Sequence, residues 1–301
     1  MKSERKGREA VKAEALALKR SMSLGQAFQQ IVDNCLAHVQ ANAGNVAKTR
    51  DVESLHQMRV GMRRLRSALG MFEDVLRLPE ALQRDLDWLA DELGSARDWD
   101  VLAETTLPMI ARGLPDPARI ARVEQAAADK ATRHHASAAA AAGSARYTRL
   151  MRGIERWMQS KEWRADAMGQ PLRGFAREVI KRDERRLRRR ARKLPTATPE
   201  ERHRVRIAAK KTRYAAEFFA SLFPARRVRD YVKALTALQD ELGLLNDITV
   251  ATRLLAEIVE SEPGLAMEAG FAEGLLAARI PDEGRAATKR WKKLAKVEPP
   301  R

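Results

Sequence analysis

A row of basic side chains with a histidine at its head occurs twice in the chain. The first copy contains His56, Arg59, Arg63, Arg64 and Arg66. The second copy repeats the spacing with His203, Arg206, Lys210, Lys211 and Arg213. Guanidinium and ammonium groups are the donors that proteins use to bind phosphate oxygens, and arginine binds them in a forked geometry. The motif therefore indicates binding of an anion that carries several phosphate groups.

Helical geometry places these side chains on one face. At 3.6 residues per turn, the histidine and three of the four bases of the first copy fall within an arc of roughly 80°, beside an apolar arc. Surface helices usually relieve such a row with acids four positions away, and we read neither row as containing them. A solvated charged face is the alternative interpretation. Arg64 and Lys211 lie off the arc, where they either widen the basic band or pair with acids on neighbouring helices.

A third basic row precedes the second copy. Its members share one arc of a predicted helix and are Arg177, Lys181, Arg185, Arg188 and Arg192. Basic runs are also found on solvated helices and in nucleic-acid-binding tails, but the position of this row favours the same anion site. The corresponding segment of the first half, residues 31–39, is nearly uncharged.

A second repeated block follows each basic row. Residues 91–98 and 240–247 both contain Asp-Glu-Leu-Gly and, after three more residues, Asp. We interpret Gly94 and Gly243 as helix ends, with Asp98 and Asp247 as caps of the next helices. Metal-binding or catalytic carboxylates are the alternative. Arg97, just before the first of these acids, could reach the anion site.

The composition favours an all-α protein with an anionic partner. Lys and Arg total 57 against 40 Asp and Glu, a net charge of +17, and Arg outnumbers Lys. This excess favours polyanions or anionic membranes as partners. Aromatic residues are only 5% of the chain and no long alternating run indicates a strand. The stretch 126–142 is rich in alanine and predicts a helix.

The two repeated blocks predict an internal duplication into two helical bundles of about four helices each. We place the first half at residues 21–165 and the second at residues 166–297. Residues 1–20 are interpreted as a basic N-terminal arm, either mobile or a loosely docked helix.

Several classes of protein lack support in the sequence. The single Cys35 excludes an intramolecular disulfide, and no apolar run is long enough for a signal peptide or a membrane span. We therefore expect a cytoplasmic protein. Phosphate-binding glycine loops, serine nucleophile elbows and zinc-binding His-Glu-x2-His pairs do not occur, so we expect no enzyme, no cofactor and no metal.

The motifs resemble those of the CHAD family, the conserved histidine α-helical domain. The resemblance rests on the two histidine-headed basic rows and the paired Leu-Gly-x2-(Arg/Asn)-Asp blocks, and it covers about residues 21–297. It implies two pseudo-symmetric helical bundles whose basic surface binds inorganic polyphosphate, often in polyphosphate granules. Family members are frequently fused to a CYTH domain, whose Glu-x-Glu-x-Lys motif this chain lacks near its start, so triphosphatase activity is not carried over.

We therefore expect binding of inorganic polyphosphate by the three basic rows, with phosphate or sulfate ions able to occupy the same site. Binding of RNA or DNA by the same surface is the main alternative, although single-strand binders usually interleave aromatic residues for base stacking. A polyphosphate hydrolase or kinase would need acids to hold Mg²⁺. Adhesion to granules or membranes through the basic arm is a further alternative. The sequence does not predict the oligomeric state.

Overall fold

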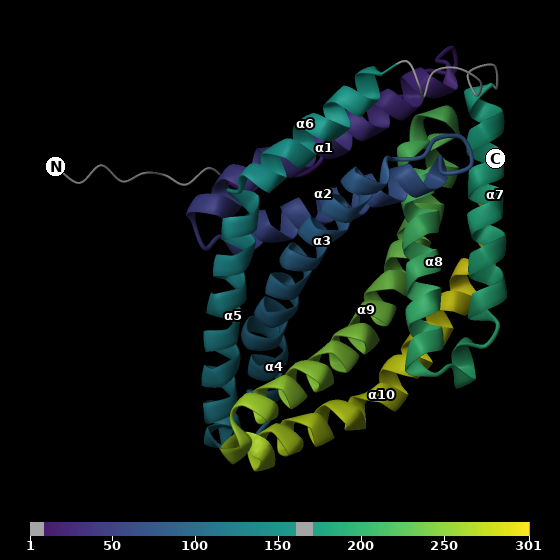
Figure 1. Ribbon diagram of the computed structural model, residues 1–301. Coiled ribbons are helices and arrows are strands. Elements are labelled where there is room, and N and C mark those ends of the chain that lie inside the picture. Colours follow the sequence, from purple (N-terminus) through teal and green to yellow (C-terminus); the bar gives the residue numbers. More distant parts are fainter. Residues whose placement is uncertain (1–8, 161–170, 301) are drawn as a thin grey trace. The chain divides into compact units, whose positions relative to one another are not determined.

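The structure is a computed structural model that describes residues 9–160 and 171–300. Within these residues it contains helices and no strand, so the predicted all-α class is confirmed (Figure 1). The α-helices are α1 (Leu24–Lys48), α2 (Val52–Met71), α3 (Glu80–Val101), α4 (Leu107–Ala111), α5 (Ala121–Ala142), α6 (Ala145–Gln159), α7 (Leu172–Ala191), α8 (Pro199–Phe218), α9 (Ala225–Ser261) and α10 (Ala266–Leu294). Short turns are the π-helix η1 (Leu102–Thr106) and the 3-10 helices η2 (Pro117–Ile120), η3 (Leu194–Thr196), η4 (Ala220–Leu222) and η5 (Pro263–Leu265).

The chain forms two compact units, and each unit is discontinuous in sequence. The first consists of Met1–Leu16, Met22–Arg97 and Ala131–Gln170, and the second of Ala17–Ser21, Asp98–Lys130 and Pro171–Arg301. Helices α3 and α5 each contribute residues to both units. The division at residues 165 and 166 stays a prediction, and the segment 98–130 that it assigns to the first half belongs to the second compact unit.

The first unit is built around α1 and α2. The ring of Phe28 on α1 lies 4.7 Å from that of Phe72 at the end of α2 and 6.0 Å from that of Trp157 on α6. Helix α6 runs beside α1 (Figure 1), where the amide of Gln40 donates to Glu155 over 2.9 Å. Aromatic pairs at such distances contribute beyond their buried area, so these contacts fix the helices that flank the first basic row.

Gly61 allows α1 and α2 to approach closely. A Cβ atom at this position would lie 2.8 Å from Cγ2 and 3.1 Å from the backbone nitrogen of Val39. Both distances are shorter than a packed methyl group tolerates. Gly70, on the same helix, has no atom within 4 Å of the equivalent position. The equivalent of Gly61 in the second basic row is Ala208.

The segment before α1 is extended and docked. Asn42 is fully buried, and its side chain accepts from the backbone N–H of Val11 over 2.9 Å and donates to the Val11 carbonyl over 2.8 Å. Asn34 donates to the carbonyl of Glu14. Residues 9–19 therefore form neither of the arrangements that the sequence suggested, a mobile arm or a docked helix, while residues 1–8 lie outside the described part.

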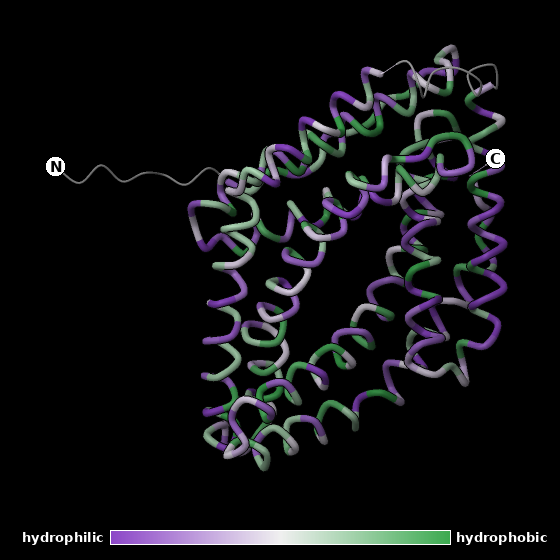
Figure 2. Tube along the Cα trace, viewed as in Figure 1, coloured by the Kyte–Doolittle hydropathy of each residue, from purple (hydrophilic) through white to green (hydrophobic). Residues whose placement is uncertain are grey.

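The second unit places α8 between α7 and α9, and packs α9 against α10. Its core contains Leu187 of α7, Val205 of α8, Leu238 of α9 and Ala287 of α10, all at most 1% exposed. Helix α10 continues through Pro281. In Figure 2, α7 is mostly hydrophilic, in agreement with its basic row.

The predicted helix ends at Gly94 and Gly243 are wrong. Helix α3 continues through Gly94 to Val101, and α9 continues through Gly243 to Ser261. In α9 the buried Leu238, Leu242 and Leu245 keep a spacing of three or four residues across the glycine. A glycine in a helix costs about 1 kcal/mol, and continued burial of leucines outweighs that cost.

Among the helices of residues 9–160 and 171–300, none is both long and apolar enough to cross a membrane.

Candidate functional site

Both basic helices begin at residues whose side chains cap the helix. Asp51 accepts hydrogen bonds from the backbone of Glu53 and Ser54 at the start of α2. Thr198 and Glu201 form a reciprocal capping box at the start of α8, with distances of 3.1 and 3.3 Å. These caps satisfy backbone donors that would otherwise lack partners, and they fix where each basic row begins.

In the first unit, the basic row of α2 faces the repeated block of α3. Nη1 of Arg59 donates to the carbonyl oxygen of Gly94 over 2.8 Å. His56 is half-buried, and burial lowers its pKa. Arg97 on α3 lowers this pKa further, whereas Glu53 raises it. Arg63 and Arg59 also lower this pKa, so the free protein favours the neutral ring of His56 over the imidazolium.

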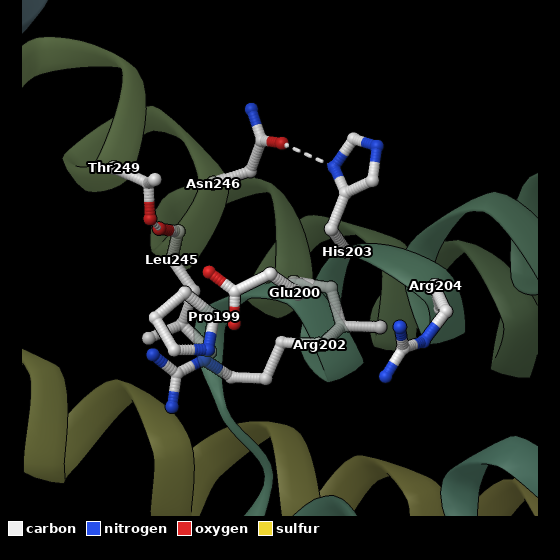
Figure 3. Close-up of a pocket in the computed structure, with 9 residues that line it drawn as sticks. Pro199, Glu200, Arg202, His203, Arg204, Leu245, Asn246 and Thr249 are labelled. Carbon is white, nitrogen blue, oxygen red and sulfur yellow. Dashed lines mark hydrogen bonds between the residues drawn. The ribbon is translucent and has the colours of Figure 1, made fainter. Parts of the chain in front are cut away.

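In the second unit, Asn246 of α9 joins the histidine and the first arginine of α8. Its Oδ1 lies 3.2 Å from Nδ1 of His203 and accepts from Nη1 of Arg206 over 3.2 Å. Figure 3 shows the other ring nitrogen of His203 directed away from Asn246. A neutral imidazole has one N–H. With Nδ1 donating to Asn246, the other ring nitrogen of a neutral His203 is an acceptor on the side away from Asn246.

The contact of Arg59 in the first unit and that of Arg206 in the second involve corresponding positions of the two repeats. Arg59 and Arg206 occupy the same place in the repeated motif, and both bond to the repeated block on the following long helix. Arg97 and Asn246, next to the two histidines, are also equivalent positions. This correspondence agrees with an internal duplication, which stays a prediction. The role of Asn246 is not among the predictions from sequence, although its place in the repeated block was the available signal.

Several members of the basic rows are paired with acids of this chain. Arg66 lies 2.9 Å from Asp87 of α3. Arg213 lies 3.0 Å from Glu217 and donates to Gln239 over 3.0 Å. The reading that neither row has an acid four positions away is thus wrong for Arg213. The nearby carboxylates partly cancel the positive charge that Arg66 and Arg213 present to a ligand.

The remaining bases of the two rows are half-buried: Arg63, Arg64, Lys210 and Lys211. Of the two that lie off the arc, Arg64 donates to the amide oxygen of Asn34 on α1 over 3.0 Å. It lies next to the fully buried thiol of Cys35, whose pKa burial raises to about 12.

The row on α7 is partly engaged within its own unit. Arg188 donates to Glu184 over 2.7 Å and to the carbonyl of Ala295 over 3.3 Å, and Lys181 lies 3.7 Å from Glu178. The other members of this row are exposed: Arg177, Arg185 and Arg192. A cavity of about 420 Å³ lies between α7 and the segment after α10, lined by Lys181, Arg185 and Arg188.

Asp98 and Asp247 do not cap helices, because both lie inside continuous ones. They line one small cavity of about 20 Å³ within the second unit. Burial raises the pKa of Asp247, nearby Arg206 lowers it, and Asp98 raises it. Asp98 lies 3.9 Å from Arg253. Across the described residues, no three His, Cys, Asp or Glu side chains are grouped so that they could hold a metal ion.

Comparisons with known proteins agree with this architecture. The family profile described as CHAD domain matches residues 30–256. The crystal structure of the CHAD domain from the plant Ricinus communis is 39% identical, covers 98% of this chain and 99% of its own, and superposes with a TM-score of 0.90. PptA from Streptomyces chartreusis shares the fold at 19% identity, with a TM-score of 0.59 over 88% of this chain and 99% of its own. No protein with a curated description matches the chain. The profile and the Ricinus structure together show that this chain belongs to the CHAD domain family.

Proposed function

We propose that this protein binds inorganic polyphosphate without chemically changing it, through the basic faces of α2, α8 and α7. The CHAD family is linked to polyphosphate binding, and its members are generally non-catalytic binding domains. In a cell that stores polyphosphate, such binding would bring the protein to polyphosphate granules.

One observation carries the proposal: uncharged acceptors orient the equivalent arginines of both basic rows. Arg59 donates to a backbone carbonyl and Arg206 to an amide oxygen. A guanidinium carries five N–H donors in a fixed fork, so one bond to a neutral oxygen orients the group while its other donors can form charge-assisted bonds to phosphate.

The length of the basic rows suits a chain of phosphates. The ten-residue step from His203 to Arg213 rises about 15 Å along the helix axis. Several phosphate groups of an extended polymer can lie along such a path. Each contact releases condensed counterions, which makes the affinity depend on salt.

Nucleic acid is the alternative ligand for the same charge, and the position of Tyr214 argues against it. Non-specific single-strand binders stack bases on exposed aromatic side chains. Tyr214 is the aromatic residue that follows the second basic row, and it is only 2% exposed. Competition separates the two ligands, because polyphosphate should displace single-stranded DNA whereas the reverse exchange should fail.

The first prediction concerns charge on the proposed path. Replacing Arg63, Lys210 and Lys211 together with glutamine should weaken binding of long-chain polyphosphate more than tenfold, because charge-assisted hydrogen bonds are lost. With about six phosphates engaged, the logarithm of the affinity should fall with the logarithm of salt at a slope near −4, and the triple variant should reduce the slope to about −2. Titration at several salt concentrations measures both quantities.

The control removes equal charge elsewhere. Arg226, Arg229 and Lys233 are exposed on the first turns of α9, and their replacement with glutamine should change the affinity less than about twofold. Equal losses in the two variants would show that only net charge matters. Shortening of the polymer during incubation with Mg²⁺ would contradict the non-catalytic assignment.

A further inference from the structure

A cavity of about 330 Å³ lies beside His203, where the start of α8 meets α9 (Figure 3). Its floor is apolar and includes Pro199, Leu242 and Leu245. Both leucines are at most 3% exposed and belong to the core of the second unit. Inorganic polyphosphate has no apolar atoms, so its binding gives no reason for an open apolar cavity next to the basic row.

The size and walls of the cavity suit a single flat ring system. Small-molecule sites in proteins span roughly 300–1,000 Å³, and this cavity is at the lower end of that range. Nη1 of Arg202 donates to the carbonyl of Ala197 over 2.9 Å, and Figure 3 shows its guanidinium beside Pro199. A guanidinium held in this way presents a flat face, which stacks favourably on an aromatic ring.

Hydrogen-bond acceptors face one end of the cavity. Glu200 lines it, and its carboxylate accepts from the hydroxyl of Thr198 over 2.7 Å, which lowers the pKa of Glu200 and keeps it ionised. The hydroxyl of Thr249 donates to the carbonyl of Leu245 over 3.1 Å, which leaves its oxygen as an acceptor. Carboxylates accept readily from the exocyclic amine of a nucleobase.

The basic row of α8 begins at the edge of the cavity. His203 lines the cavity, and the basic row continues from it along α8 through Arg206 to Lys210. Helical rise places these two side chains about 4.5 and 10 Å further along the axis. A ligand with an amine-bearing ring and a chain of phosphates therefore matches the order of apolar floor, acceptors and cations.

We propose that this cavity binds the base of a nucleoside polyphosphate whose ring carries an exocyclic amine, with its phosphates lying along α8 over Arg206 and Lys210. The inference rests on the proposed function for the phosphate path and adds a second ligand class to it. The ring supplies the apolar and stacking contacts that an inorganic chain of equal length lacks.

The test compares ATP with inorganic tripolyphosphate on the full chain by calorimetric titration at fixed salt. We expect ATP to bind about tenfold more tightly, which equals about 1.4 kcal/mol. Thr249→Trp fills the cavity from α9 and should reduce the affinity for ATP to that for tripolyphosphate without changing the latter. Thr288→Trp is the matched control, because Thr288 also bonds to a carbonyl of its own helix, α10, and does not line the cavity. This control should change neither affinity.

A second variant tests the amine without filling the cavity. Glu200→Gln should weaken ATP several-fold but leave inosine triphosphate unchanged, because the inosine ring carries a carbonyl where adenine carries its amine. Glu260→Gln, at an exposed position of α9, should affect neither nucleotide.

The outcomes separate this inference from the proposed function. Equal affinity for ATP and tripolyphosphate, or equal weakening of both by Thr249→Trp, overturns the nucleotide site while polyphosphate binding stands. Binding of ATP with the expected variant effects, but without binding of long-chain polyphosphate, overturns the proposed function alone.

Discussion

The arginines of the basic rows donate to different kinds of acceptor. Arg59 and Arg206 donate to uncharged oxygens, whereas Arg66 and Arg213 lie beside carboxylates. An arginine already paired with a carboxylate must give up part of that attraction to bind a phosphate, so its net gain is smaller. Residue type alone therefore does not predict which members of a basic row gain most from binding phosphate. The acceptors that each member already contacts must also be known.

The lowered pKa of His56 predicts how the affinity for polyphosphate depends on pH. Burial and Arg97 lower its pKa in the free protein, so the ring is neutral at pH 7. A bound polyanion favours the imidazolium, and binding then takes up a proton. The affinity for polyphosphate should therefore rise as pH falls from 8 to 6, by about threefold or more, and should keep rising below the usual imidazole range near 6.5.

His56→Gln should reduce this pH dependence, since glutamine can donate a hydrogen bond but does not titrate. Titrations at constant ionic strength and several pH values measure the effect. Equal affinity of the unsubstituted protein at pH 6 and pH 8 would rule out proton uptake on binding.

At the scale of helices, the contact between α1 and α2 depends on Gly61. Gly61→Ala should destabilise the protein by about 1–3 kcal/mol, because the added methyl group overlaps Val39. Gly70→Ala, on the same helix with no atom within 4 Å of the new methyl group, should stabilise it by up to about 1 kcal/mol. Urea unfolding of the two variants measures both changes.

Comparing Gly61→Ala with Gly70→Ala separates the effect of packing on stability from that of helix propensity. Alanine has the same helix propensity advantage at both positions, so a difference in sign reflects the Val39 contact. If Gly61→Ala were as stable as Gly70→Ala, the close approach of the two helices would not be a constraint.

The helix starts could be predicted from sequence because their signals are local. Asp51 and Thr198 cap α2 and α8, and the caps use atoms within three residues. Gly94 and Gly243 gave a misleading local signal, since the leucines that keep both helices continuous are buried by partners distant in sequence. Local chemistry predicts where a helix can end, and tertiary packing decides whether it does.

The candidate site could be predicted only in part for the same reason. The histidine-headed rows are visible as a repeated motif, and the CHAD resemblance that they carry is confirmed. The acceptor Asn246 and the acid Asp87 act through contacts between helices, so no spacing within one helix predicts them. Whether all the predicted bases bind polyphosphate stays a prediction.

At the scale of the whole molecule, the second compact unit needs a segment from the first half of the sequence. Arg122 lies 3.2 Å from Glu268, and the guanidinium of Arg119 lies 4.3 Å from the centroid of the Phe271 ring. Residues 98–130 thus cover part of α10. A fragment restricted to residues 166–297 lacks this segment and should expose the apolar residues beneath it.

We expect this fragment to unfold at a lower temperature than the full chain and to bind a dye for exposed apolar surface. Circular dichroism during heating, with dye fluorescence measured in parallel, checks both. A fragment as stable as the full chain would show that the continuous half is a self-sufficient unit.

Gly61 also limits how the two basic helices can be recombined. A chimaera that carries the α8 sequence in place of α2 would bring the methyl group of Ala208 against Val39, whereas the reciprocal chimaera would only remove a methyl group. At this position, therefore, the α2 sequence can replace that of α8 without a clash, whereas the α8 sequence cannot replace that of α2. Engineering a protein with two identical anion-binding helices should start from the glycine-containing copy.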